Sequence, residues 1–272
     1  MLKPATDPTD FGPQLRTWRL ARRMTQEQLA GDAEISTRHL SFLEGGRARP
    51  SREMVLVLGS ALELPLRDRN ALLGAAGFAP VYRDSPLEGP ALIPVMRAVD
   101  HILNQQEPFG AVLMDRAWNL IKANRGAQRV LALFPPLEAA AASNLLLTLC
   151  HPGGIRRHIV NWEPLVSLLI DRHRREVAAF PNDTARRDVL DAMMGQPGVA
   201  ELGHRPSAPQ GHAPYVTVHL RNGPVEARLF TLLTTLGTPL DVTAEELRIE
   251  SYFPADDATE RLLRGMAGDS RD

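Results

Sequence analysis

The feature that most constrains this chain is a pair of short predicted helices joined by a tight turn, within residues 25–50. Thr25 opens a capping box, because its hydroxyl can cap the amide three residues on while Gln28 reaches back. Ser36 can cap a second helix through Leu43, and this helix is predicted to end at the following Gly-Gly pair, where left-handed backbone is readily adopted. The spacing therefore predicts two short helices in a compact helical domain.

Three further helices complete the predicted N-terminal domain. An apolar stripe in residues 14–22 indicates the first, and Ser51 can cap a helix with apolar residues at helical spacing. Pro65 suits the first turn of the fifth helix. Together the signals predict an all-α domain of five helices over residues 1–78.

The second helix of the pair, residues 36–44, has two distinct faces. Leu40 and Leu43 are predicted to face inward. The residues predicted to lie together on the opposite face are Thr37, Arg38, Ser41 and Phe42. That face offers a guanine reader in Arg38 and two hydroxyls. The ring of Phe42 either touches thymine methyl groups or packs in the core or a dimer contact, and the sequence leaves both open.

This segment resembles the Cro/C1-type helix-turn-helix of phage repressors, in which the second helix enters the major groove. The resemblance implies that Gln26 contacts phosphate and that Arg19 and Glu44 brace the first and third helices. Arg47 and Arg49 follow the recognition helix and are placed for phosphate contact. The residues predicted to contact DNA are therefore Gln26, Thr37, Arg38, Ser41, Phe42, Arg47 and Arg49. Because one such motif contacts a half-site, we expect a homodimer on a double-stranded operator with half-sites roughly 34 Å apart.

The rest of the chain has a different sequence pattern. Residues 79–94 are rich in Pro and Gly without a clean period, which predicts a linker. Residues 95–265 mix helical and antiparallel-strand patterns, which predicts an α+β domain, and a polar frayed tail is expected over 266–272. The expected strands are a hairpin of 109–115 and 118–123, followed by 215–220, 225–235 and 247–253. The expected helices are 91–106, 125–133, 162–178 and one capped by Thr184.

A longer resemblance covers nearly the whole chain. The stretch from Ser41 to Pro80 is similar to the MmyB-like family of transcription regulators, as are FGAVLMDRAWNLIKAN, NWEPLVSLLIDRHRREVAAFPND and RLFTLLTTLGTPLDVTAEELRIESYFP. In that family a Cro/C1 domain precedes a ligand-binding domain with a PAS-like fold. The resemblance implies a small apolar ligand, such as a fatty acid or similar metabolite, within the PAS-like core.

The apolar residues of the hairpin and of later elements are the candidates for lining such a pocket. They are Val112, Met114, Trp118, Leu120, Trp162 and Phe230. For each of these residues taken singly, ordinary core packing is the favoured explanation. Neither Lys122 nor Arg228 can be selected as the partner of a ligand head group. A second hypothesis is therefore that the C-terminal domain is a ligand-free protein-interaction module.

Composition limits the cellular compartment and the classes of partner that we expect for this chain. The 272 residues have a formal net charge of −1, so the molecule as a whole has no strong bias toward nucleic acid or membrane. The single cysteine, Cys150, excludes an intrachain disulfide and a cysteine zinc cluster. The start lacks a secretory signal and no stretch is apolar enough to span a bilayer, so we expect a cytoplasmic protein without membrane partners. Only two of the 31 basic residues are lysine, a bias typical of a GC-rich bacterial genome.

The signals of catalysis are absent from the sequence. Lys122 stands at a predicted strand end, which disfavours a Ser–Lys dyad, and neither an H-E-x-x-H string nor a nucleotide-binding loop occurs. His204, His212 and His219 are spaced too widely for a close metal-binding pair. Cys150 would sense redox state only if it were exposed with a lowered pKa. The sequence thus predicts a regulator without catalytic residues, metal or cofactor, apart from a bound apolar ligand.

Overall fold

A computed structural model describes residues 11–136, 138, 143–203 and 214–268. The chain divides into two compact units. The N-terminal unit contains the chain up to Gly89 together with Ala178–Asp183 and Thr238–Glu245. The C-terminal unit contains the remaining segments from Pro90 onward. Each unit has its own apolar core, so each is described by itself.

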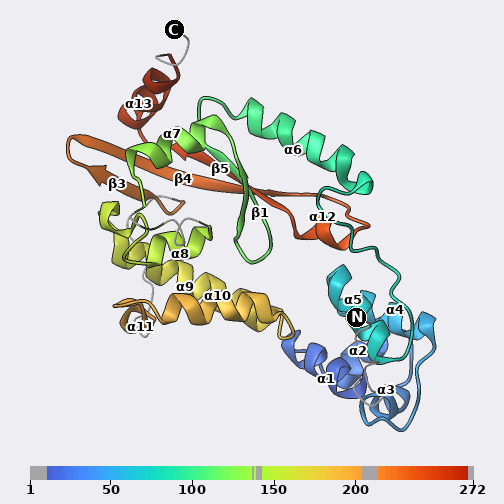
Figure 1. The fold of residues 1–272 in the computed structure, drawn as a ribbon. Helices are drawn as coiled ribbons and strands as arrows, with labels where there is room; N and C mark the ends of the chain where they lie inside the picture. Colours follow the sequence, from blue (N-terminus) through green and yellow to red (C-terminus); the bar gives the residue numbers. More distant parts are fainter. Residues whose placement is uncertain (1–10, 137, 139–142, 204–213, 269–272) are drawn as a thin grey trace. The chain divides into compact units, whose positions relative to one another are not determined.

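The N-terminal unit contains the five expected helices (Figure 1). They are α1 (Phe11–Ala21), α2 (Gln26–Asp32), α3 (Thr37–Glu44), α4 (Arg52–Ala61) and α5 (Leu66–Ala75). Their starts follow the predicted caps. The side chains of Thr25, Ser36 and Ser51 each accept a hydrogen bond from the amide three residues on, and Gln28 completes the capping box of Thr25. Local sequence therefore specifies where these helices begin.

One core holds the five helices together. Leu40 and Leu43 of α3 are fully buried, as predicted, and they belong to the same cluster as Trp18 of α1. Gly12 lets α1 approach the end of α3 closely, because a Cβ at this position would lie 2.5 Å from the carbonyl oxygen of Glu44. Burying one face of α3 leaves its opposite face directed away from the core.

The C-terminal unit is built on a five-stranded antiparallel sheet with the order β2-β1-β5-β4-β3. The strands are β1 (Ala111–Met114), β2 (Leu120–Ala123), β3 (Val218–Asn222), β4 (Val225–Thr235) and β5 (Arg248–Pro254). The predicted hairpin is confirmed as β1–β2, and β3 begins three residues later than expected. The sheet with its flanking helices has the expected α+β, PAS-like architecture.

Helices flank both faces of the sheet, with α6 on one face and α8, α9 and α10 on the other (Figure 1). Helices α6 (Ile93–Gln105), α7 (Arg125–Leu133), α9 (Trp162–Ala179) and α10 (Thr184–Met194) were expected. The elements that were not expected are η2 (Pro90–Leu92), α8 (Leu145–Cys150), η4 (Arg156–His158), α11 (Val199–Leu202), α12 (Val242–Glu246) and α13 (Asp257–Gly268). Within the described parts of the chain, no helix combines the length and apolar character needed to cross a membrane.

Two boundaries differ from those expected. Helix α6 begins at Ile93, two residues later than the helix expected over 91–106 and still within the expected linker of 79–94, and Pro94 in its first turn suits a helix start. Helix α13 continues through residues 266–268, which were expected to belong to the frayed tail. A cap signal for α13 was present in the sequence, since Asp256 accepts a hydrogen bond from the amide of Thr259 at 2.8 Å.

Strand register assigns the side chains of the sheet to two faces. Met114 and Leu233 pack in one cluster with residues of α9, so we call their side the α9 face. Lys122 pairs with Asp100 of α6, which identifies the opposite side as the α6 face. Side chains alternate between these faces along each strand, so Glu250, the partner of Leu233, lies on the α9 face.

Candidate nucleic-acid interface and ligand site

The outward face of α3 presents the predicted recognition residues together. Thr37 and Arg38 are exposed, while Ser41 and Phe42 are half-buried. Arg47 and Arg49, which follow the helix, are exposed. A guanidinium group, two hydroxyls and two trailing arginines thus occupy one end of the unit. These groups suit hydrogen bonding to base edges and pairing with phosphates.

The ring of Phe42 gathers two of these arginines. The guanidinium carbons of Arg38 and Arg47 lie 5.4 and 5.3 Å from the ring centroid. Both distances are within the range of a cation–π interaction, which contributes about 0.5–1 kcal/mol at exposed sites. Phe42 therefore holds one arginine of the helix and one that follows it near the same aromatic ring.

A buried ion pair braces α1 against α3, as the Cro/C1 resemblance implied. Arg19 donates to both carboxylate oxygens of Glu44, at 2.6 and 3.0 Å, and both side chains are less than one-tenth exposed. Gln26 joins the pair, because its amide donates to Glu44 at 2.8 Å. Burial acts to raise the pKa of Glu44, but the hydrogen bonds from Arg19 and Gln26 outweigh it and lower that pKa.

Gln26 consequently has a role inside the protein as well as its predicted one. One N–H of its side-chain amide is engaged by Glu44, which leaves the other N–H and the amide oxygen. The remaining N–H can still contact a phosphate. The pair with Glu44 would fix the direction from which it does so.

The predicted ligand-lining residues do not all come together. Met114 and Trp118 belong to one buried cluster, and Trp162 packs against it. Val112 is also buried, with Leu120 half-buried on the neighbouring strand. Phe230, in contrast, lies opposite Phe253 in the register and stacks on Tyr215 and Phe253, on the α6 face. Because side chains alternate between the two faces along a strand, Phe230 points away from the face on which Met114 lies.

A polar cluster that the sequence did not indicate lies beside Trp118. The guanidinium carbons of Arg172 on α9 and Arg248 on β5 lie 5.0 and 6.0 Å from a ring centroid of Trp118. Glu176 faces both arginines, at 3.2 Å from Arg172 and 3.7 Å from Arg248. Burial acts to raise the pKa of Glu176, but His173, whose ring nitrogen lies 3.7 Å away, and the nearby arginines outweigh it and lower that pKa to about 2. The carboxylate is therefore charged at neutral pH.

The two cations considered from sequence as head-group partners have other contacts. Lys122 pairs with Asp100 at 2.5 Å, and both side chains are about half exposed. Arg228 pairs with Glu226 at 3.1 Å and with Asp256 at 3.5 Å. Both cations therefore take part in surface ion pairs.

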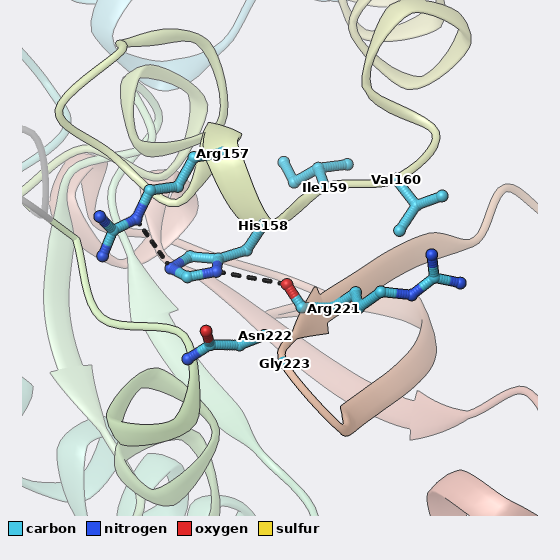
Figure 2. Close-up of a pocket in the computed structure, with 7 residues that line it drawn as sticks. All are labelled: Arg157, His158, Ile159, Val160, Arg221, Asn222 and Gly223. Carbon is cyan, nitrogen blue, oxygen red and sulfur yellow. Dashed lines mark hydrogen bonds between the residues drawn. The ribbon is translucent and has the colours of Figure 1, made fainter.

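A separate polar pocket of ≈480 Å³ lies between η4 and the turn joining β3 to β4 (Figure 2). Its lining residues are Arg157, His158, Ile159, Val160, Arg221, Asn222 and Gly223. His158 Nε2 accepts from Arg157 Nε at 3.0 Å, so its Nδ1 carries the proton and donates to the Arg221 carbonyl at 3.3 Å. The guanidinium groups of Arg157 and Arg221 point in opposite directions, so they do not converge on one ligand (Figure 2).

Comparison with known families decides the general identity. A model of the MmyB-like transcription regulator ligand binding domain matches residues 95–266, and a helix-turn-helix domain model matches residues 10–72. The chain belongs to the MmyB-like transcription regulators. It therefore combines a DNA-binding helix-turn-helix with a ligand-binding domain, and regulators of this kind are not enzymes.

Other comparisons add little to the family assignment. One solved structure that this MmyB-like regulator matches is described as the structure of an RNA-binding Light-Oxygen-Voltage receptor. The identity is 12% and the TM-score 0.25, over 96% of this chain and 64% of that one. This regulator thus spans less than two thirds of that protein's length. No curated protein matches the chain.

Two remaining groups of the MmyB-like regulator were considered from sequence as reactive or metal-binding. Cys150 is fully buried, and burial raises the pKa of its thiol to about 12, so it lacks the exposure and lowered pKa of a redox sensor. His204 and His212 lie outside the described residues, and His219 pairs with Glu226. Among the residues that are described, no three metal-ligating side chains form a cluster.

Proposed function

We propose that this regulator reads a specific operator as a homodimer and that its C-terminal domain holds a small apolar ligand of the fatty-acid type. The observation that carries the DNA-reading part is the outward face of α3. There Arg38 stands on the side of the helix opposite to buried Leu40 and Leu43, with Arg47 beside the same aromatic ring. Chromosomal DNA as the target places the protein in the bacterial cytoplasm.

The proposed readers have distinct roles. Arg38, Thr37, Ser41 and the free edge of Phe42 are placed to meet base edges, whereas Gln26, Arg47 and Arg49 are placed to contact phosphates. Base contacts confer sequence preference, and phosphate contacts fix the position of the protein and make binding depend on salt. A dimer doubles both sets, because one helix-turn-helix contacts only a half-site.

Selection of binding sites from random DNA tests the DNA-reading part. We expect the full-length protein to enrich two related half-sites roughly 34 Å apart, one helical turn or a multiple of it. Footprinting on the enriched DNA should show protection on one side of the duplex. A single asymmetric site, or no enrichment, would contradict dimeric reading.

The ligand part is supported by the buried apolar cluster around Met114 and Trp118 and by the family to which the chain belongs. A ligand would act on DNA binding through different affinities for two arrangements of the DNA-binding heads. The alternative is a C-terminal domain whose core is filled by its own side chains and which serves only to bind another protein. Thermal unfolding with lipophilic compounds separates the two, because a bound ligand stabilises the folded state by RT ln(1 + [L]/Kd).

A further inference from the structure

Trp118 is held in an unusual conformation in the turn between β1 and β2. It is 3% exposed, and its backbone φ is +66°, a left-handed conformation that bulky residues rarely adopt. The loop is fixed around it, because Asp115 accepts hydrogen bonds from the amides of Ala117 and Asn119 at 2.8 and 2.9 Å. Strain of this kind persists where the surrounding structure imposes it, and it is concentrated at functional sites.

The indole N–H of Trp118 is a buried hydrogen-bond donor. Its Nε1 has no hydrogen-bond partner among the described residues. Trp162 provides the internal comparison, since its Nε1 donates to the carbonyl of Leu149 at 2.9 Å. A buried N–H that lacks a partner carries an unrecovered desolvation cost of about 1–3 kcal/mol. Native proteins retain such a group where a water, an ion or a ligand completes it.

Cationic donors surround the same indole. The side chain of Arg248 is 17% exposed, and its closest carboxylate contact is the 3.7 Å approach to Glu176, which exceeds hydrogen-bond distance. Arg172 uses its Nε toward Glu176 at 3.2 Å. Oε2 of Glu176 itself has no hydrogen-bond partner among the described residues. Both guanidinium groups therefore lie near the Trp118 ring, and neither hydrogen-bonds Oε2 of Glu176.

Two carboxyl groups, those of Glu176 and Glu250, lie near the two guanidinium groups. Glu176 is ionised, because its pKa is lowered to about 2. Burial raises the pKa of Glu250, the other carboxyl group near Arg172, which disfavours its negative charge. An anionic oxygen from outside the chain would bring a further negative charge to the two guanidinium groups.

We propose that Trp118 Nε1, with the guanidinium groups of Arg172 and Arg248, forms a subsite for the anionic oxygen group of an otherwise apolar ligand. The proposal rests on the proposed ligand-binding function. The ligand oxygen accepts from the indole N–H and from the arginines, and the apolar cluster of Met114, Val166 and Ile170 adjoins the same indole. A carboxylate and a phosphate monoester share this chemistry.

Titration of the full-length protein with matched ten-carbon probes tests the subsite. The probes are decanoate, decyl phosphate and the neutral decanol, each below its micelle concentration. The three indole N–H signals are followed by NMR on 15N-labelled protein, and the signal absent from Trp118→Phe is that of Trp118. We expect decanoate or decyl phosphate to shift this signal and to bind about tenfold or more tightly than decanol, as expected for charge-assisted hydrogen bonds.

Variants separate the subsite from general apolar binding. Arg248→Met and Arg172→Met each keep an apolar stem but remove the charge, and each should weaken binding of the anionic probe about tenfold while changing decanol binding less than about twofold. Arg264→Met is the matched control, because Arg264 lies 5.1 Å from the ring centroid of Phe109 elsewhere in the unit. It should leave the affinity for the anionic probe unchanged.

The outcomes distinguish the subsite from the function on which it rests. Equal binding of decanoate, decyl phosphate and decanol, unaffected by Arg248→Met and Arg172→Met, would overturn the subsite and leave apolar ligand binding intact. Absence of binding by every probe to the unmodified protein would contradict the proposed ligand class and the subsite with it. Binding without a shift of the Trp118 signal would show that water completes this indole, which also overturns the proposal.

Discussion

The two units differ in how the hydrogen-bonding capacity of certain buried polar groups is used. In the N-terminal unit, Arg19, Gln26 and Glu44 meet one another, and the helix starts are capped by side chains. In the C-terminal unit, Trp118 and Glu176 retain buried atoms that have no hydrogen-bond partner in the described part of the chain. Buried polar groups that hydrogen-bond to one another make a unit rigid, which suits recognition at its surface. Buried polar atoms without partners indicate a place where a ligand supplies the missing hydrogen bond. The difference fits our proposals that DNA is recognised at the surface of one unit and the ligand in the interior of the other.

The largest expected effect comes from breaking the satisfied network. Arg19→Met leaves the carboxylate of Glu44 buried without its cation, which should reduce the free energy of unfolding by about 3–5 kcal/mol. Urea unfolding followed by circular dichroism measures it. Replacing both partners, as Arg19→Met with Glu44→Met, should recover most of the loss. A double variant as unstable as the single one would show that the loss does not come from the unpaired carboxylate of Glu44.

The next effect tests the outer surface. Arg38→Ala should weaken operator binding by about 1–3 kcal/mol and relax base preference at one position, because a bidentate contact to guanine is lost. Its matched control, Arg49→Ala, should weaken binding to all DNA alike and reduce the salt slope by about one unit. Equilibrium binding to operator and to scrambled DNA at several salt concentrations measures both. Unchanged preference in Arg38→Ala would misplace the recognition face.

A pair of tryptophan variants compares satisfied and unsatisfied donors within one unit. Trp162→Phe leaves the carbonyl of Leu149 unpaired and should lower the free energy of unfolding by about 1 kcal/mol. Trp118→Phe removes an N–H that has no partner in the described structure, so ligand-free protein should lose much less stability. Thermal unfolding of delipidated protein measures the two. Equal destabilisation would mean that the N–H of Trp118 is satisfied.

The smallest expected effect concerns Phe42. Phe42→Leu keeps an apolar side chain but removes the ring beside Arg38 and Arg47, and it should weaken operator binding by about 0.5–1 kcal/mol. Phe42→Tyr keeps the ring and should bind nearly as well as the original protein. Fluorescence anisotropy with labelled operator resolves this difference. Wild-type affinity in Phe42→Leu would indicate that the ring does not position the arginines.

Local signals explain why the N-terminal unit was predictable from sequence. Caps at Thr25, Ser36 and Ser51 act within three residues, so helix starts follow directly from the chain. Helices α8 and α11 are too short to show a period. Helix α13 was missed although the cap at Asp256 was present in the sequence.

The interior site depends on long-range pairing, which sequence alone does not provide. Arg172 and Arg248 are far apart along the chain and meet Trp118 only through the packing of α9 and the register of β5. Phe230 shows the same limit, because it was grouped with Met114 on apolar character alone. The pairing of β4 with β5 places it on the α6 face, since side-chain direction alternates at every residue.

Native mass spectrometry of the protein from its expression host, compared with a denatured sample, tests the central claim most directly. It reports the number of subunits and any small molecule carried in the C-terminal unit at the same time. We expect a dimer with the additional mass of a small molecule, and this mass should be lost on denaturation. A dimer without additional mass, together with no thermal stabilisation by lipophilic acids, would contradict the ligand-holding interior and favour a protein-interaction module.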